Sequence, residues 1–296
     1  MSTEATTETF DTEPIVVEHP LVEFVRMFLR NKAGVLGFAM LLFIVLTSIF
    51  GPLIYPVDPF EIVGVPVSPP GEDGWLLGTD SLGRDLVAGL IHGSRTTLAV
   101  GAAAAACTVI IGLIIGALAG YYGGWVDNVL MRITEFFQVL PNLILAMVLI
   151  TLFSPTLITI VFSIGIVSWT GIARLTRAEF LSIREREYVM AARSIGAENQ
   201  RIIWHVILPN ALPPLIVTAA LNVGVAILFE AGLSFLSLGD PNVMSWGALI
   251  GDNREAFFEA WWAVTFPGLA IFATVLSVSL IGDGLNDALN PKLRER

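Results

Sequence analysis

The run TLAVGAAAAACTVIIGLIIGALA, residues 97–119, contains no charged side chain. A helix needs roughly 20 apolar residues to cross the ~30 Å hydrocarbon core of a bilayer, and this run is long enough to do so. Backbone groups in hydrocarbon must be satisfied within helices or a closed barrel, and an unbroken apolar run favours a helix over an alternating barrel strand. The run therefore predicts a transmembrane helix in an all-α membrane protein.

Five further stretches meet the same criterion. Together with the first they place six predicted spans at residues 35–54, 97–119, 129–153, 157–173, 215–236 and 263–282. The composition agrees, because apolar residues make up 55% and charged residues only 14% of the 296 residues, with a mean hydropathy of +0.76. Soluble domains carry about 25% charged residues. The sequence therefore predicts a polytopic membrane protein with six transmembrane helices.

Two of these spans contain residues with structural consequences. Pro141 lies inside the third span, where the missing backbone hydrogen bond predicts a kink. Gly112, Gly116 and Gly120 follow one another at intervals of four residues and therefore share one face of the second helix. Small residues let a neighbouring membrane helix approach closely, so this face is predicted to be a packing surface.

The distribution of cations predicts the orientation, since segments retained in the cytoplasm are enriched in Lys and Arg. With a cytoplasmic N-terminus, thirteen of the sixteen cationic residues fall in inner segments, and only Arg84, Arg95 and Arg254 fall in outer ones. We therefore expect a cell-membrane protein with both termini in the cytoplasm. The expected organisation is a cytoplasmic acidic tail at 1–34, a first span at 35–54, an extracytoplasmic segment at 55–96, and a transmembrane domain at 97–296 with a cytoplasmic loop at 174–210.

Charge and missing motifs exclude several functions. The net charge of −10 argues against nucleic-acid binding. The only cysteine, Cys107, lies in an apolar run, so neither a disulfide framework nor a thiolate metal site is expected. A phosphate-binding loop ends in Gly-Lys-Ser/Thr, and neither Lys32 nor Lys292 follows a glycine. We therefore expect a chain that is not an enzyme, holds no cofactor or metal, and leaves any nucleotide site to other chains.

The predicted cytoplasmic loop, residues 174–210, reads as short amphipathic helical pieces. Gly196 is suited to a helix C-cap with positive φ, and Pro209 is expected to end the next piece. The stretches YVMAARSIG (188–196) and ILPN (207–210) resemble the EAA loop of ABC-importer permeases, although Met190 stands where many members have glutamate. The resemblance implies an ATPase-contacting segment that contains Glu187, Tyr188, Met190, Ala191, Ala192, Arg193, Gly196 and Pro209.

Three further stretches resemble the C-type subunit of the dipeptide and oligopeptide permeases. They are LGTDSLGRD (77–85), EAGLSFLSLG (230–239) followed by SWG (245–247), and GDGLNDALNP (282–291). The first contains a predicted extracytoplasmic motif of Gly78, Thr79, Asp80, Gly83, Arg84 and Asp85.

This resemblance implies an architecture and a set of partners. The expected fold is one N-terminal span followed by the five-helix core of a type I importer. The expected partners are the lipid bilayer, a homologous second permease subunit, two cytoplasmic ATPases that hold ATP and Mg²⁺, and an extracytoplasmic binding protein. The implied cargo is a dipeptide or oligopeptide, with nickel and sugars left open because the binding protein makes much of the selection.

Glu230 is the one acidic residue well inside a predicted span. An ionisable group there is costly unless it faces a cavity or a partner, so it is a functional candidate. It is either the proton carrier of a secondary, ion-coupled transporter, which is the strongest rival function, or a structural group that hydrogen-bonds to a neighbouring helix or to the external segment after Gly239.

The predicted topology can be tested by labelling single cysteines with an impermeant thiol reagent in intact cells, after Cys107 has been replaced. Cysteines at Glu8, Asn199 and Glu295 should be shielded, while a cysteine at Glu72 should react, because the cation distribution puts the first three inside. Labelling at Asn199 from outside would contradict the six-span topology.

Overall fold

A computed structural model describes residues 20–72 and 74–289. The described chain is helical apart from loops, with two isolated β-bridges. The helices are α1 (Pro20–Arg30), α2 (Lys32–Ile54), α3 (Leu86–Tyr122), α4 (Gly124–Val139), α5 (Asn142–Phe153), α6 (Leu157–Ser168), α7 (Thr170–Arg184), α8 (Glu187–Ser194), α9 (Asn199–Arg201), the π-helix η1 (Ile202–Ile207), α10 (Leu208–Phe235), α11 (Trp246–Asn253), the 3₁₀-helix η2 (Arg254–Ala256) and α12 (Trp261–Leu289).

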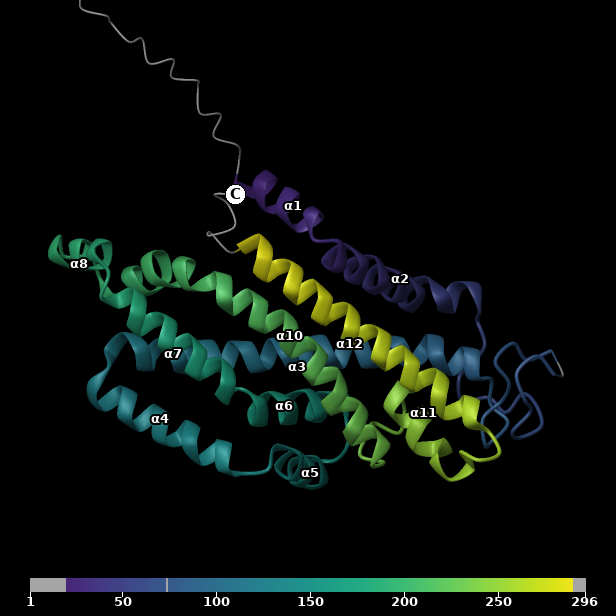
Figure 1. The fold of residues 1–296 in the computed structure, drawn as a ribbon. Helices are drawn as coiled ribbons and strands as arrows, with labels where there is room; N and C mark the ends of the chain where they lie inside the picture. The colour runs from purple at the N-terminus through teal and green to yellow at the C-terminus, as the bar shows by residue number, and fades with distance from the viewer. Residues whose placement is uncertain (1–19, 73, 290–296) are drawn as a thin grey trace, which may run out of the picture.

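The helices form an elongated bundle around α3, which packs against α7, α6 and α10 (Figure 1). α2 packs against α12, and α12 against α10. α8 lies at one end of the bundle, and α11 lies at the opposite end together with the segment between α2 and α3. We refer to these as the α8 end and the α11 end.

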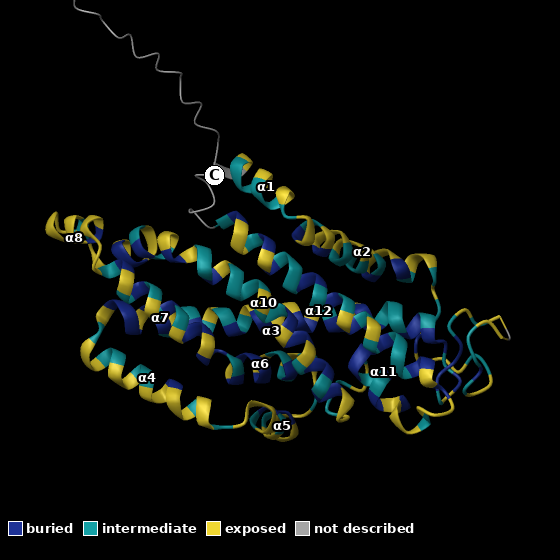
Figure 2. Ribbon diagram, in the orientation of Figure 1, coloured by how far each residue is buried: buried dark blue, intermediate teal, exposed yellow. Residues whose placement is uncertain are grey.

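The six-span, all-α prediction is confirmed by the lengths and composition of the described helices. Four helices are long and apolar enough to cross a bilayer: 32–54, 86–122, 199–235 and 261–289. The pairs α4–α5 and α6–α7 each pass the same test as one bent span, which gives six. Large apolar side chains are exposed on the outside of the bundle, among them Phe43, Phe136 and Phe272, as expected for surfaces that face hydrocarbon (Figure 2).

The third span is not the continuous helix that was predicted for 129–153. α4 and α5 meet at 88°, with Leu140 and Pro141 between them. Leu140 is extended (ψ 134°), because the ring of a following proline disfavours the helical conformation of the preceding residue. The expected kink at Pro141 is therefore present, and it amounts to a full break.

The fourth span runs further than predicted. α6 and α7 meet at a bend of 48° next to Trp169, and α7 continues to Arg184 instead of ending at 173. The first residues of the predicted loop 174–210 are therefore helical. Hydropathy marks where a helix leaves the apolar layer, and α7 continues past that point with polar residues.

Pro209 does not end a helix, which contradicts the sequence prediction. It lies at the start of α10, in a helix that is continuous from 199 to 235. A proline ring clashes with the carbonyl four residues earlier in an α-helix, and the wider turns of the π-helix η1, directly before α10, relieve this crowding. The Asn210 Nδ2 group donates to the Val206 carbonyl oxygen at 2.7 Å and so satisfies a backbone acceptor.

The boundaries near the N-terminus also differ from the expected ones. Residues 1–19 of the predicted acidic tail lie outside the described residues, but 20–30 form the helix α1, which packs on α12. α2 then begins at Lys32, where the Asn31 side chain accepts a hydrogen bond from the Gly34 amide at 2.8 Å. α3 begins at Leu86 rather than Thr97, because Asp85 caps it by accepting from the Val87 amide at 2.9 Å.

The glycine face of α3 packs closely against α7, as predicted. A β-carbon on Gly116 would lie 2.4 Å from the Ala173 carbonyl oxygen, and one on Gly120 would lie 2.6 Å from the Phe180 β-carbon. Gly112 meets α7 in the same way. The two backbones are therefore closer than any larger residue allows.

We predict that Gly116→Ala destabilises the protein, although alanine is the better helix former. Overpacking of this kind costs about 1–3 kcal/mol, which exceeds the ~1 kcal/mol that alanine gains over glycine in a helix. Gly268→Ala is the matched control, since no atom lies within 4 Å of a β-carbon there. Thermal unfolding in detergent should show a lower midpoint for Gly116→Ala alone. Equal midpoints would contradict the close packing.

Candidate functional site

α8 is held to the bundle by one buried side chain and presents others outward. Val189 is fully buried, in a cluster with Ile202 and Ile207 of η1. On the exposed side, Tyr188 and Met190 are about half exposed, at 46% and 49%, although both are large and apolar. A short helix with an anchored inner face and an apolar outer face is suited to docking, and we call residues 187–196 the knob.

The end of α8 is a Schellman motif. The Gly196 amide donates to the Arg193 carbonyl at 3.0 Å and the Ala197 amide donates to the Ala192 carbonyl at 3.1 Å. Gly196 has φ +81°, which confirms the predicted positive-φ cap. No heavy atom lies within 4 Å of a β-carbon built at Gly196, so the backbone conformation alone requires glycine there.

The remaining predicted coupling residues are placed as follows. Glu187 begins α8 and shares a face with Met190 and Ala191, three and four residues later, so its exposed carboxylate lies beside the position of Met190. Glu185, which lies just before α8, pairs with Arg184 at 3.0 Å. Pro209 is exposed on α10, beyond the π-helix, and is not part of the knob.

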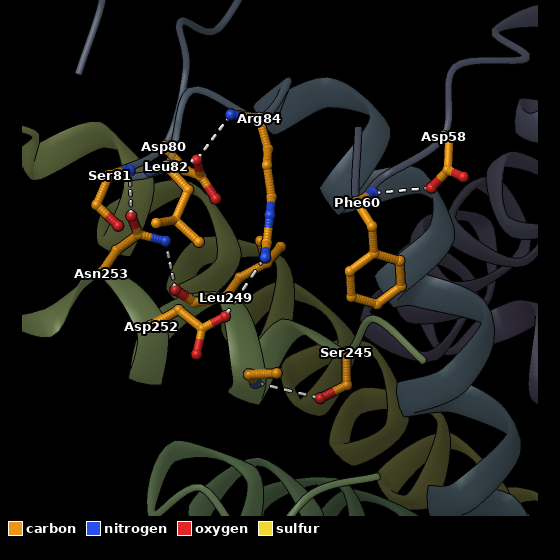
Figure 3. Close-up of polar contacts among 11 residues, drawn as sticks. Asp58, Phe60, Asp80, Ser81, Leu82, Arg84, Ser245, Leu249, Asp252 and Asn253 are labelled. Atoms are coloured by element: carbon orange, nitrogen blue, oxygen red, sulfur yellow. Dashed lines mark hydrogen bonds and ion pairs between the residues drawn. The ribbon is translucent and has the colours of Figure 1, made fainter. Parts of the chain in front are cut away.

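At the α11 end, the predicted motif of residues 78–85 folds on itself. The Asp80 side chain is buried, and its Oδ1 accepts from the Leu82 amide at 2.9 Å and the Arg84 amide at 2.8 Å (Figure 3). Gly78 and Gly83 both have φ +80°, and a β-carbon on either would lie 2.4 Å from a backbone oxygen. The two glycines and the aspartate therefore specify one tight backbone path.

The same motif is attached to α11 and α12. The Ser81 amide donates to Asn253 Oδ1 at 2.8 Å, and the Trp262 indole donates to the Thr79 carbonyl at 3.1 Å. The Arg84 guanidinium lies 3.7 Å from the Asp252 carboxylate (Figure 3). The six predicted motif residues thus come together as a structural cap, and Asn253 and Trp262 are partners that sequence reasoning missed because they are more than 170 residues away in the chain.

Two ionisable side chains of this cap, Asp252 and Tyr55, interact with charged neighbours in the same chain. Burial raises the pKa of Asp252, and the neighbouring Arg84 guanidinium opposes that shift. Burial and a hydrogen bond to Asp85 raise the pKa of Tyr55 to about 12, so its hydroxyl remains protonated and donates to Asp85 at neutral pH.

Glu230 is buried on α10, with 2% of its surface exposed. Its Oε1 accepts from the Ser234 hydroxyl at 2.7 Å, and the hydroxyls of Ser245 and Thr97 also interact with this carboxyl group. Thr97 belongs to α3 and itself accepts from the Trp246 amide at 3.2 Å. Glu230 therefore stands at a polar junction of α10, α3 and the start of α11, where Oε1 has a hydroxyl partner and Oε2 is buried without a hydrogen-bond partner.

Comparison with known proteins provides family matches over most of the chain. A family described as the binding-protein-dependent transport system inner membrane component matches residues 112–295, and the N-terminal transmembrane domain of oligopeptide transport permease C matches 19–65. The chain is 40% identical to the di/tripeptide transport system permease protein DppC of Pseudomonas aeruginosa, over 95% of each chain. It is 35% identical to the oligopeptide transport system permease protein OppC of Bacillus subtilis, over 90% of this chain and 88% of that one.

Among solved structures, an inward-facing form of the MetNI methionine ABC transporter has the same fold. Its TM-score is 0.57 at 20% identity, over 68% of this chain and 96% of that chain. These findings define the class as the permease subunit of a binding-protein-dependent ABC importer. Within that class, the chain belongs to the dipeptide and oligopeptide permease family.

We predict that Glu230→Gln retains transport, since glutamine still accepts from Ser234 and keeps the shape of the side chain. Glu230→Leu should lower the unfolding free energy by about 1–3 kcal/mol, because it leaves buried hydroxyl groups without their acceptor. Thermal unfolding and solute uptake would be measured for both variants. A Glu230→Gln protein that assembles normally but does not transport would show that the charge is needed.

Proposed function

We propose that this chain is one of two homologous permease subunits of an importer for short peptides, and that α8 receives the force of ATP hydrolysis from a separate ATPase. The observation that carries the proposal is the exposed, rigidly capped α8 at one end of the bundle. The peptide cargo is supported by the relatives, which are named as dipeptide and oligopeptide permeases.

The surface chemistry of α8 supports docking. Met190 and Tyr188 supply apolar area, Ile195 is 86% exposed just beyond the helix, and the small Ala191 and Ala192 let a partner surface approach closely. Charged residues at the edge, Glu187 and Arg193, suit a polar rim around an apolar contact. ATP and Mg²⁺ would be held by the ATPase, and this chain would supply no covalent chemistry.

The orientation follows from the charges at the two ends. Arg184, Arg186, Arg193 and Arg201 cluster at the α8 end, whereas the outer Arg84 lies in the cap at the α11 end. We therefore place the α8 end in the cytoplasm, with both termini, and the α11 end outside, toward an extracytoplasmic binding protein. The lipid bilayer surrounds the exposed apolar faces of the bundle.

The proposed mechanism is mechanical coupling. When a pair of ATPases binds ATP and closes, it displaces α8. The helices attached to α8 then switch the path between the two permease subunits from inward to outward access. Such a switch requires ATP to bind one state more tightly than the other. ATP coupling takes the place of the ion coupling that the rival, a secondary transporter, would need.

The experiment adds bulk to the knob. We expect Ala192→Trp and Gly196→Val to leave the protein in the membrane but to release the ATPases or to abolish stimulation of ATP hydrolysis by the loaded binding protein. Tryptophan blocks close approach, and valine cannot adopt the positive φ of Gly196 without strain. Co-purification of the ATPases and hydrolysis in proteoliposomes are the measurements.

Ser182→Trp is the matched control, since Ser182 is exposed on α7 at the same end but lies outside the knob. An interfacial helix on anionic lipid would tolerate added apolar surface or gain from it. Wild-type co-purification and wild-type stimulation in both knob variants would therefore reject the docking assignment.

A further inference from the structure

The C-terminal end of α3 contacts the last turn of α8 and the first residue of α9 through one side chain, Tyr121. The ring is buried, with 5% exposed, and its hydroxyl donates to Asn199 Oδ1 of α9 at 2.6 Å. The Arg193 guanidinium of α8 lies over the same ring, 5.8 Å from its centroid. Arg193 lies in the last turn of α8 and Asn199 begins α9, so Tyr121 contacts the chain both before and after the turn at Gly196.

The chain that leads into α8 is attached to the same C-terminal end of α3. Arg184, at the end of α7, donates from Nη1 to the carbonyl oxygens of Tyr121 at 3.1 Å and Gly120 at 3.3 Å. Carbonyls in the last turn of a helix lack partners within the helix, and a cation there is also favoured by the helix dipole. A β-carbon on Gly123 would lie 3.0 Å from this Nη1 atom, so glycine leaves room for the contact.

Contacts between α3, α4 and α7 also join these three helices into one body. The Arg177 guanidinium of α7 makes two parallel hydrogen bonds to the Asp127 carboxylate of α4, one of them 2.6 Å long from Nη2. A bidentate arginine–carboxylate pair restricts orientation as well as distance. Together with the glycine face of α3, it prevents the three helices from moving independently.

Val189 alone would let α8 pivot, because a single buried anchor fixes a point and leaves the angle free. Tyr121 supplies the second and third contacts, at Arg193 and Asn199, which fix that angle relative to α3. We infer that Tyr121 is a positioning residue for coupling, which transmits displacement of α8 to the α3–α4–α7 body instead of letting the loop absorb it. This inference rests on the proposed docking of an ATPase at α8.

The test compares Tyr121→Phe and Tyr121→Leu with Tyr122→Leu in the complete transporter. Phenylalanine removes only the hydrogen bond to Asn199, whereas leucine also removes the ring beneath Arg193. Tyr122, which is 49% exposed, is the matched control: its ring packs edge-to-face on the Tyr121 ring at 5.1 Å between centroids, so Tyr122→Leu removes that contact while keeping the Tyr121 side chain itself. The readouts are co-purification of the ATPases, ATP hydrolysis with loaded binding protein, and solute transported per ATP hydrolysed.

We expect all three variants to retain the ATPases. Transport per ATP should fall by about fivefold or more in Tyr121→Leu, which loses a hydrogen bond and a cation–π contact, and by less in Tyr121→Phe. Tyr122→Leu should match the wild type. Unchanged transport per ATP in Tyr121→Leu would overturn the inference. If the ATPases do not bind the wild-type chain through α8, the proposed function is overturned instead.

A distance measurement separates positioning from a general loss of stability. Nitroxide labels would be attached to the exposed residues Glu198, just beyond the knob, and Asn128 on α4, in the complex and after replacement of Cys107. The wild type and Tyr122→Leu should give one narrow distance distribution, and Tyr121→Leu a broader one at a temperature well below its unfolding midpoint. An equally narrow distribution in Tyr121→Leu would also overturn the inference.

Discussion

The close contact between α3 and α7 is the constraint on which the rest of the structure depends. Lipid tails are as apolar as the side chains they surround, so burial of apolar surface does little to bring membrane helices together. Dispersion forces and shape must do so instead, and the glycine face of α3 meets α7 at distances that a methyl group would prevent. Because α8 follows directly after α7, this contact also sets where the proposed coupling site projects.

The two ends of the bundle use polar groups in different ways. At the α11 end, Asp80, Thr79 and Arg84 are engaged with the chain itself or with α11 and α12, which makes a rigid cap. At the α8 end, Tyr188 and Met190 remain exposed although they are apolar. The exposed apolar side chains of α8 are the surface that the proposed ATPase contact would cover. The α11 end is held by contacts within the chain, although it also exposes apolar side chains, among them Phe258 at 94%.

Buried and half-buried polar residues join the helices at selected points along the bundle. Glu230 meets hydroxyl groups from α3 and α10 toward the α11 end, and the half-buried Arg177 meets Asp127 of α4 toward the α8 end. A buried polar group is costly without partners, and so each junction favours one relative placement of its helices. Such junctions suit a transporter subunit whose helices must move as bodies rather than deform.

The sequence by itself determined the six spans, a kink at Pro141, the packing face of α3 and the glycine cap after α8, because each follows from a local rule of length, spacing or backbone conformation. It also carried the family resemblance, through short motifs that can be recognised without a structure.

Only the tertiary structure decided that Pro209 continues a helix, that Asn253 and Trp262 complete the cap, and that Tyr121 contacts both Arg193 and Asn199. Those features join residues that are far apart in the chain, and the physical reason they escape sequence reasoning is that a contact depends on how helices cross, which no local pattern specifies.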